Sequence, residues 1–389
     1  MRIRKIPFPP INLQACMAPD HPDHEASCTE LRRQACDYGI AMLSVDGVTP
    51  SSYALVRAMM ESYWSQPKSA LDLDVRPQHH RQVGRMEAYC ETAMPYPERL
   101  AALEEDQRPY PHAGPNPLER FFWRFGSRPS TSNFPERHAD PVIPERFERE
   151  WEPVMNSWGE IVLDTLFDLA EALEFAFRLP PGTMVKKLQA GPHLISPTGC
   201  NILELLAKRC HKPVEELSFA LRQAASEDKL RRINRNLNLS GAVVSHYHDD
   251  FNPITIHGPA NMPGLICWAR NGDPFTPEIP PGCLFAQFGA QTEHLFAGGL
   301  HEDGPMAGMH QVVVTWETLK VLWLRLKLGL PPIRVSSTFF GHGNADQPLE
   351  VLPPFRVDGW RQRYPSTTFG AHSAAVIEKI GLAAQEIAG

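Results

Sequence analysis

Apolar residues recur every three to four positions along several segments of the N-terminal half, which is the spacing of one face of a helix. Residues 151–177 show the longest such pattern, and Pro180-Pro181-Gly182 predicts its end. Upstream, residues 29–66 predict a helix over 31–37, a strand over 40–45 and a helix over 51–65. Residues 93–150 are rich in proline and charge, so we expect long ordered loops there, around the aromatic cluster Phe121-Phe122-Trp123.

The C-terminal half shows a different pattern, in which short apolar runs alternate with Gly/Pro turns. From Gly241 onward this spacing predicts the strands of a sandwich or jelly roll, with 191–197 as its first strand. Two helical interruptions are expected, one over 200–238 and one over 315–330. In the second, four leucines recur at helical spacing, namely Leu319, Leu322, Leu326 and Leu330. One long strand through this segment is the alternative. The last 20 residues predict an amphipathic helix that caps the barrel or a partner.

Composition narrows the classes of protein. The net charge of −7 provides no basic surface for nucleic acid, and no apolar run approaches the roughly 18 residues of a membrane span. Prolines, not an apolar signal core, follow the basic start Met1-Arg2-Ile3-Arg4-Lys5, so a cytoplasmic protein is expected. The 8 cysteines form no Cys-x-x-Cys pair, which argues against a zinc ribbon, and Cys267 and Cys283 are expected to be buried thiols.

The stretch His248-Asp249-Asp250 is the strongest chemical signal. If it opens the apolar strand 251–256, His248 and Asp250 lie on one strand face and can hold one metal ion, while Asp249 points away. His246-x-His248 is a rival pair, and a surface turn rich in His and Asp is the alternative without chemistry. A third ligand can come from downstream, where His294, His301 and His310 compete. Two histidines and one carboxylate suit non-haem Fe(II).

A second signal is Arg334-x-Ser336, which opens the run Ser337-Thr338-Phe339-Phe340. A guanidinium binds a carboxylate through two parallel hydrogen bonds, and a hydroxyl two residues later lies on the same strand face. An ordinary strand arginine is the alternative.

Taken in order, His248-x-Asp250, His310 and Arg334-x-Ser336 with their flanks resemble the isopenicillin N synthase-like family of Fe(II) oxygenases, most of which use 2-oxoglutarate. The segment 334–340 is particularly similar to that of the cephalosporin-type ring expandases. The resemblance covers most of the chain and is strongest from Gly241 to Pro353. Relatives place the arginine closer to the last histidine, and they lack the 200–238 segment.

The resemblance implies a fold, a site and an activity. The fold would be mainly β with α, a double-stranded β-helix (jelly roll) core with N-terminal helices packed around it. Fe(II) would bind His248, Asp250 and His310, and 2-oxoglutarate would reach Arg334 and Ser336. The activity would be a dioxygenase that uses O2 to oxidise a small-molecule substrate by hydroxylation, desaturation or cyclisation, with release of succinate and CO2.

Two other functions stay open at this point. One is an isopenicillin N synthase-like oxidase that does not use 2-oxoglutarate, and the other is a non-catalytic binding protein on this fold. We expect one catalytic domain over 1–389, acting as a monomer or homodimer. It would comprise an N-terminal region (1–185), the β-helix core (186–345) and a C-terminal tail and helix (346–389).

Overall fold

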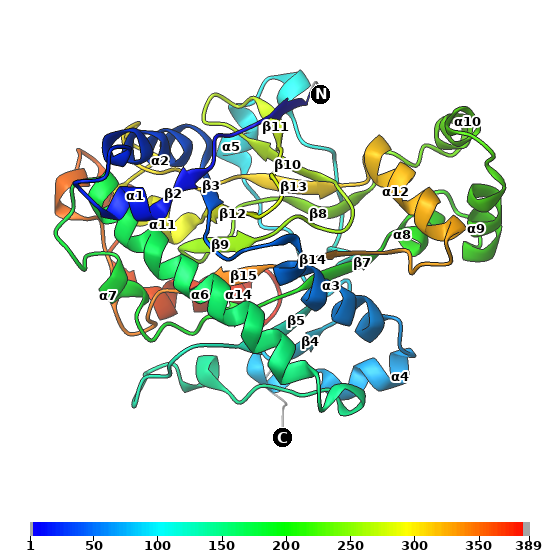
Figure 1. Cartoon of the computed structure of the whole chain (residues 1–389), viewed down its shortest axis with the longest axis horizontal. Helices are drawn as coiled ribbons and strands as arrows, with labels where there is room; N and C mark the ends of the chain where they lie inside the picture. Colours follow the sequence, from blue (N-terminus) through cyan, green and yellow to red (C-terminus); the bar gives the residue numbers. More distant parts are fainter. Residues whose placement is uncertain (1–2, 384–389) are drawn as a thin grey trace.

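The computed structural model describes residues 3–383, and two facing β-sheets form its centre (Figure 1). The first sheet has five strands in the order β1-β11-β10-β13-β8. Their bounds are Arg4–Ile6 (β1), Pro274–Pro277 (β11), Leu265–Trp268 (β10), His310–Val313 (β13) and Val243–His248 (β8).

The second sheet has ten strands, nine of them in the order β14-β7-β5-β6-β15-β9-β12-β3-β2, with β4 paired to β5. Their bounds are Ile11–Asn12 (β2), Ile40–Ser44 (β3), Gly84–Met86 (β4), Glu119–Arg124 (β5), Leu194–Ile195 (β6), Thr198–Asn201 (β7), Ile254–His257 (β9), Cys283–Phe288 (β12), Ile333–Ser336 (β14) and Phe339–Gly341 (β15). From β8 onward the chain passes repeatedly from one sheet to the other. This alternation is that of a jelly roll, so the predicted fold class is confirmed. A separate ribbon pairs Pro348–Leu349 (β16) with Thr367–Thr368 (β17).

Helices from the N-terminal half cover the second sheet, as predicted (Figure 1). They are Leu13–Met17 (α1), His24–Tyr38 (α2), Pro50–Trp64 (α3) and Trp151–Ala176 (α6), and the short helix Lys68–Leu71 (α4) follows α3. The predicted helix 31–37 begins earlier, at His24, because Cys28, Leu31 and Ala35 form one buried stripe at helical spacing. The helix over 51–65 is found as α3, which starts on Pro50 behind a Thr49 capping box.

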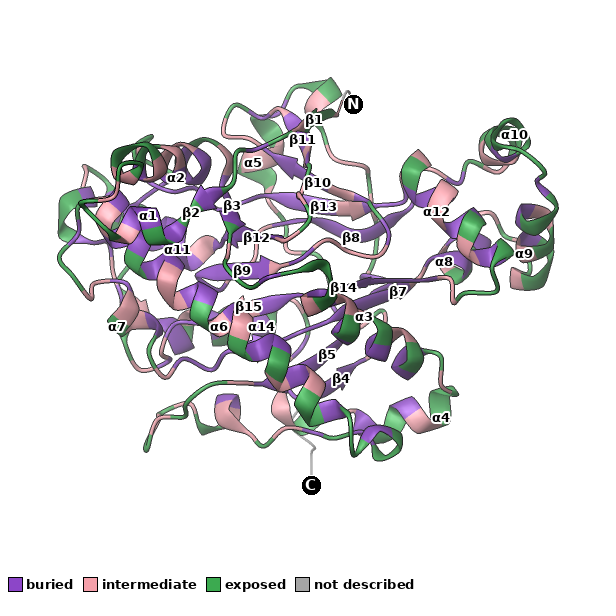
Figure 2. Cartoon of the chain, in the orientation of Figure 1, coloured by how far each residue is buried: buried purple, intermediate pink, exposed green. Residues whose placement is uncertain are grey.

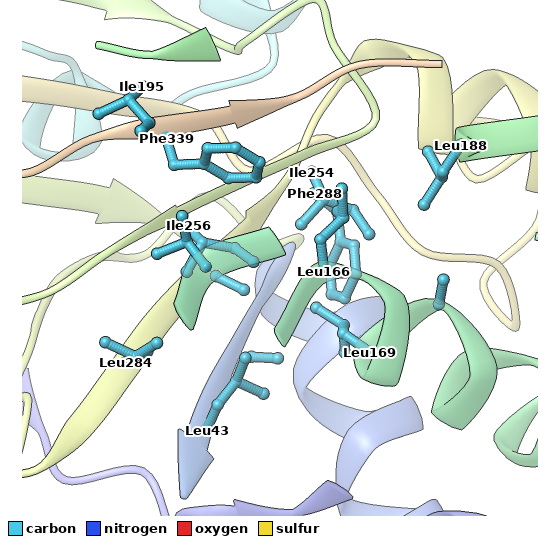
Figure 3. Close-up of a cluster of buried hydrophobic side chains, with 14 of the residues drawn as sticks. Leu43, Leu166, Leu169, Leu188, Ile195, Ile254, Ile256, Leu284, Phe288 and Phe339 are labelled. Atoms are coloured by element: carbon cyan, nitrogen blue, oxygen red, sulfur yellow. The ribbon is translucent and has the colours of Figure 1, made fainter. Parts of the chain in front are cut away.

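The long helix α6 is the main support of the second sheet. It ends at Ala176, ahead of the proline pair, as its pattern predicts. Figure 3 shows Leu166 and Leu169 of this helix beside Ile254, Phe288 and Phe339 of the sheet. All five side chains are completely removed from solvent. The resulting apolar contact fixes β9, β12 and β15 to the helix.

The prediction of loops over 93–150 is wrong in one place. Residues Glu119–Arg124 form β5 inside the second sheet, while a short helix (α5, Pro97–Ala101) and 3₁₀ turns occupy much of the rest. Phe121 and Trp123 pack in the main core, and Phe122 packs in the neighbouring one. A strand buried on both faces shows no alternation of polar and apolar residues, so its periodicity does not distinguish it from a loop cluster.

Both predicted helical insertions are present, and they pack on each other at one end of the molecule (Figure 1). The first comprises Ile202–Arg209 (α8), Val214–Gln223 (α9) and Glu227–Leu237 (α10), and the second is Trp316–Lys327 (α12). The inner sides of these helices are buried and their outer sides exposed (Figure 2). Trp323 joins the two insertions, since its indole N–H donates to the Ala224 carbonyl at 3.1 Å. Leu330 lies beyond the helix and is exposed, contrary to the expected stripe.

The remaining helices are Val185–Leu188 (α7), Ala290–Phe296 (α11), Trp360–Arg363 (α13) and Phe369–Lys379 (α14). The last of these confirms part of the predicted C-terminal helix, whose residues 384–389 lie outside the described chain. Cys267 and Cys283 are buried in strands, as expected. A helix with the length and apolar character of a membrane span does not occur in residues 3–383.

Leu322→Ala should lower the free energy of unfolding by about 2–5 kcal/mol, because the deleted atoms leave a cavity between α12 and the 202–237 helices. Urea denaturation measures this loss. Leu324→Ala is the matched control in the same helix, since Leu324 is 51% exposed, and its effect should stay within about 0.5 kcal/mol. Equal losses in the two variants would contradict the orientation of α12.

Candidate metal centre

Two histidines face each other across neighbouring strands of the first sheet. His248 ends β8, His310 begins β13, and the antiparallel register pairs these two residues directly. Their ring centroids are 4.2 Å apart. Backbone pairing therefore brings together two side chains that are 62 positions apart in the sequence.

Asp250 also lies beside these two histidines, but it does not lie in the strand that the sequence predicted. The strand β8 stops at His248, so Asp250 lies in the turn before β9 and not on the strand face that the spacing suggested. The backbone of this turn is hydrogen-bonded to the start of α11 and not to a neighbouring strand. The Ala290 N–H donates to the Asp250 carbonyl at 2.8 Å. Gly289 is required here, since a Cβ on it would lie 1.9 Å from the Asn252 carbonyl oxygen.

One nitrogen of each histidine is held by the backbone. His248 Nδ1 lies 2.6 Å from the His246 carbonyl, and His310 Nδ1 lies 2.9 Å from the Gly308 carbonyl. Carbonyls only accept, so each Nδ1 carries the proton and each Nε2 keeps a free lone pair.

The carboxylate of Asp250 is oriented in the same way. Thr255 donates its hydroxyl to Oδ2 at 2.6 Å, and the other oxygen, Oδ1, lies 3.9 Å from His248 Nε2. One donor atom from each of the three residues lies within 4.8 Å of the others. Bonds of about 2.1 Å bridge atoms up to about 4.2 Å apart, so a small inward movement suffices to hold one ion.

The protonation state of His248 also suits a ligand. Burial lowers its pKa well below the usual range, and the neighbouring His310 and His246 lower it further. The ring is therefore neutral at pH 7, and neutral imidazole is the form that binds metal.

The rival histidines do not join this group. His246 Nε2 accepts from the Asn116 amide at 3.1 Å, so this nitrogen is already bonded. His294 packs in α11 against Tyr364, with ring centroids 5.3 Å apart. His301 faces Asp303 in a loop. Within residues 3–383, the group close enough to hold an ion is the predicted set, and its role as a metal site stays a prediction.

Arg334 and Ser336 lie in β14 and line the same cavity as the three candidate ligands, which has a volume of about 280 Å³. Arg334 is 7% exposed, its Nε has no hydrogen-bond partner, and no carboxylate within the described chain pairs with it. Burial lowers its pKa to about 10, which still leaves it charged at neutral pH. This buried cation is free for an anionic ligand.

A second cavity, of about 180 Å³, shares His248, Asp250, Arg120 and Phe340 with the first. Sequence reasoning missed Arg120, His342 and His372 in its wall. Arg120 lies in the unpredicted strand β5, and no motif accompanies the other two. The helix α14 contributes His372 and Val376, so the described part of the C-terminal helix does cover this end of the barrel.

No family model matches the chain, and no curated protein matches its sequence. Solved structures share its fold. A protein described as a member of the 2OG-Fe(II) oxygenase family, from Caulobacter crescentus, has a TM-score of 0.63 at 17% identity, covering 97% of this chain and 99% of that chain.

Two further neighbours have ligands in their structures. A full-length Neurospora crassa protein in complex with alpha-KG has a TM-score of 0.63 at 14% identity, over 96% of each chain. JOX2 in complex with 2OG, Fe and JA has a TM-score of 0.60 at 14% identity, covering 97% of this chain and 87% of that chain. At these identities the likeness shows a shared fold.

His248→Ala, Asp250→Ala and His310→Ala should each reduce Fe(II) binding at least ~100-fold, because three protein ligands are the minimum for such an open site. Anaerobic isothermal titration of the metal-free protein measures the affinity. His246→Ala should bind iron nearly as the parent does, since its ring is bonded to Asn116. Loss of iron in His246→Ala together with its retention in His248→Ala would refute the ligand set.

Proposed function

We propose that the chain is a non-haem Fe(II)- and 2-oxoglutarate-dependent dioxygenase that oxidises a small molecule. One observation supports this above all: three free donor atoms from two histidines and a carboxylate share one cavity with a buried arginine that has no acidic partner in the described chain. Such a cavity can hold a cation at the three donor atoms and an anion at the arginine. A keto acid that chelates iron at one end and carries a carboxylate at the other matches both.

The donor set suits Fe(II). Two imidazole nitrogens and one carboxylate oxygen leave coordination positions open, which is the arrangement of non-haem iron oxygenases. When bound, iron and 2-oxoglutarate supply the oxygen chemistry, with succinate and CO2 as by-products. The chain's own residues fix the geometry: Thr255 and the carbonyls of His246 and Gly308 orient the three ligands before any ion arrives.

Arg334 and Ser336 would hold the distal carboxylate of 2-oxoglutarate. A guanidinium in this buried position gains more from an anion than it would in water, because the surroundings screen the charge poorly. The Ser336 hydroxyl lies 2.9 Å from the Thr338 hydroxyl, so one of them can donate to the other while the pair still offers a proton to the ligand.

The second cavity would take the substrate, since it shares His248 and Asp250 with the first. Side chains of α14 and of Gln82, Glu91, Met94 and Tyr96 line its walls and would limit the access of water to the reacting atoms. The Neurospora crassa protein has been solved with thymine and JOX2 with JA, which supports a small organic substrate here. Hydroxylation, desaturation and cyclisation remain the candidate outcomes.

The finer assignments belong to the same proposal. We place the chain in the isopenicillin N synthase-like branch, with an expandase-like segment at Arg334-x-Ser336, as one catalytic domain over 1–389. We expect it to act in the cytoplasm as a monomer or homodimer. The oxidase resembles its relatives at Arg334-x-Ser336, so an unpaired Arg334 fits either enzyme, and the spectroscopic test below separates the two. An oriented ligand set favours an enzyme over a binding protein.

The anaerobic protein with Fe(II) and 2-oxoglutarate should develop a visible charge-transfer band, since the keto acid chelates the metal. Absorption spectroscopy detects it without any knowledge of the substrate. Asp250→Ala is the control and should show no band. Iron binding without a band would favour the oxidase, and failure to bind iron would favour the non-catalytic protein.

Arg334→Leu should weaken 2-oxoglutarate binding by about 3–5 kcal/mol, the cost of leaving one partner of a buried charged pair alone. Titration of the charge-transfer band gives this affinity. Ser336→Ala should cost less, about 1–2 kcal/mol for one hydrogen bond to a charged group. Both variants should bind iron normally, and an unchanged affinity in Arg334→Leu would remove Arg334 from the site.

A further inference from the structure

An ion pair outside the ligand set lies next to the candidate metal centre. Arg99, in α5, places its Nη2 atom 2.7 Å from Oε2 of Glu293, in α11. Glu293 is 5% exposed, so its carboxylate is almost completely removed from water. A buried carboxylate needs a cation and hydrogen-bond donors around it, so the groups that surround Glu293 determine where it can lie.

Glu293 joins segments that are far apart in the sequence. Besides Arg99, it accepts the Ala307 backbone N–H at Oε2 (2.8 Å) and the Tyr364 hydroxyl at Oε1 (3.0 Å). Tyr364 in turn accepts the Gly299 N–H at 2.9 Å. One carboxylate therefore holds together α5, the segment before β13 and the residue that follows α13.

Two of these connections lead directly to candidate metal ligands. Ala307 precedes Gly308, whose carbonyl holds Nδ1 of His310 at 2.9 Å. The first N–H of α11, the helix that carries Glu293, holds the Asp250 carbonyl at 2.8 Å. A displaced Glu293 would therefore disturb backbone groups that hold both His310 and Asp250.

Arg99 also approaches the turn that carries Asp250. Its Nη2 atom lies 4.0 Å from Oδ2 of Asp249, and the Tyr96 hydroxyl donates to Oδ1 of the same carboxylate at 2.7 Å. Asp249 stands between His248 and Asp250 in the chain, and its side chain is 9% exposed. Tyr96 and Asp249 both line the second cavity. The helix α5 and the residue before it are therefore tied to the turn beside two candidate ligands.

We propose that Arg99 and Glu293 are positioning residues of the metal centre, and that Tyr96 shares this role through Asp249. The ion pair would not touch iron. It would fix the backbone around Asp250 and His310 before the ion binds, so that the ligands need little further ordering when it arrives. This inference rests on the proposed function, because it assigns the network to the metal that the three candidate ligands would hold.

Arg99→Met should weaken Fe(II) binding at least ~10-fold, because it leaves Glu293 without its cation and releases α5 from the metal turn. Anaerobic isothermal titration of the metal-free protein measures the affinity, and urea denaturation of the same protein measures its stability. Arg99→Lys should bind iron more tightly than Arg99→Met, since an ammonium group can still pair with Glu293.

Arg85→Met is the matched control. Arg85 also bridges two carboxylates, Asp72 at 2.8 Å and Glu119 at 2.7 Å, and it lies outside the walls of both cavities. The substitution should lower the urea midpoint at least as much as Arg99→Met does, because the Arg85 side chain is 5% exposed and that of Arg99 is 26% exposed. Its iron affinity should equal that of the parent, which separates positioning from a general loss of stability.

Tyr96→Phe is a milder second variant, which decides the question if Arg99→Met does not fold. It removes one hydroxyl and its bond to Asp249. Iron binding should weaken at least ~3-fold, the lower end of what one hydrogen bond contributes.

The outcomes separate this inference from the proposed function. Iron binding at the parent's affinity by Arg99→Met, or by Tyr96→Phe where Arg99→Met does not fold, would overturn the inference and leave the proposed function intact. A loss of affinity in Arg85→Met as large as that in Arg99→Met would also overturn it, because the ion pair would then serve stability alone. If the parent protein itself did not bind Fe(II), the proposed function would fail and the inference with it.

Discussion

The antiparallel pairing of β8 with β13 is the constraint on which the candidate site depends. It sets His248 opposite His310, and the register shifts between His310 and Val313, so the strand is irregular just where its side chains meet the cavity. A slip of one residue would turn either ring to the other face of the sheet. Bulges of this kind re-aim side chains beside functional sites, which fits the position of His310 in the wall of the first cavity.

Both sheets contribute side chains to the candidate site. The first supplies the histidines, while the second supplies Arg334 from β14 and the Thr255 that orients Asp250 from β9. The helix α6 holds β9 and β15 in place through side chains excluded from water (Figure 3). Apolar packing on one face of the second sheet thus fixes the polar geometry on its other face.

Much of the fold could be predicted because its elements have clear local patterns. The helices α6 and α12 follow from periodicity, and the turns follow from glycine and proline. The strand β5 could not be predicted, because burial on both faces removes the alternation that marks a strand. The three candidate ligands follow from motif order, yet the place of Asp250 in a turn depends on the contact with α11, which spacing along the chain does not contain.

The buried arginines around the two cavities differ in whether another residue balances their charge. Arg120 borders both cavities, but it is paired with Glu91, bonded to Thr198 at 3.0 Å, and stacked over Phe340 at 5.4 Å. Its charge is therefore largely balanced at the boundary. The unbalanced positive charge lies elsewhere, at Arg334 in the first cavity. Under the proposed function, the distal carboxylate of 2-oxoglutarate would be drawn to Arg334 in the first cavity, and its other end would meet the substrate of the second cavity beside His248 and Asp250, which belong to both. An arrangement of this kind positions both molecules at one centre.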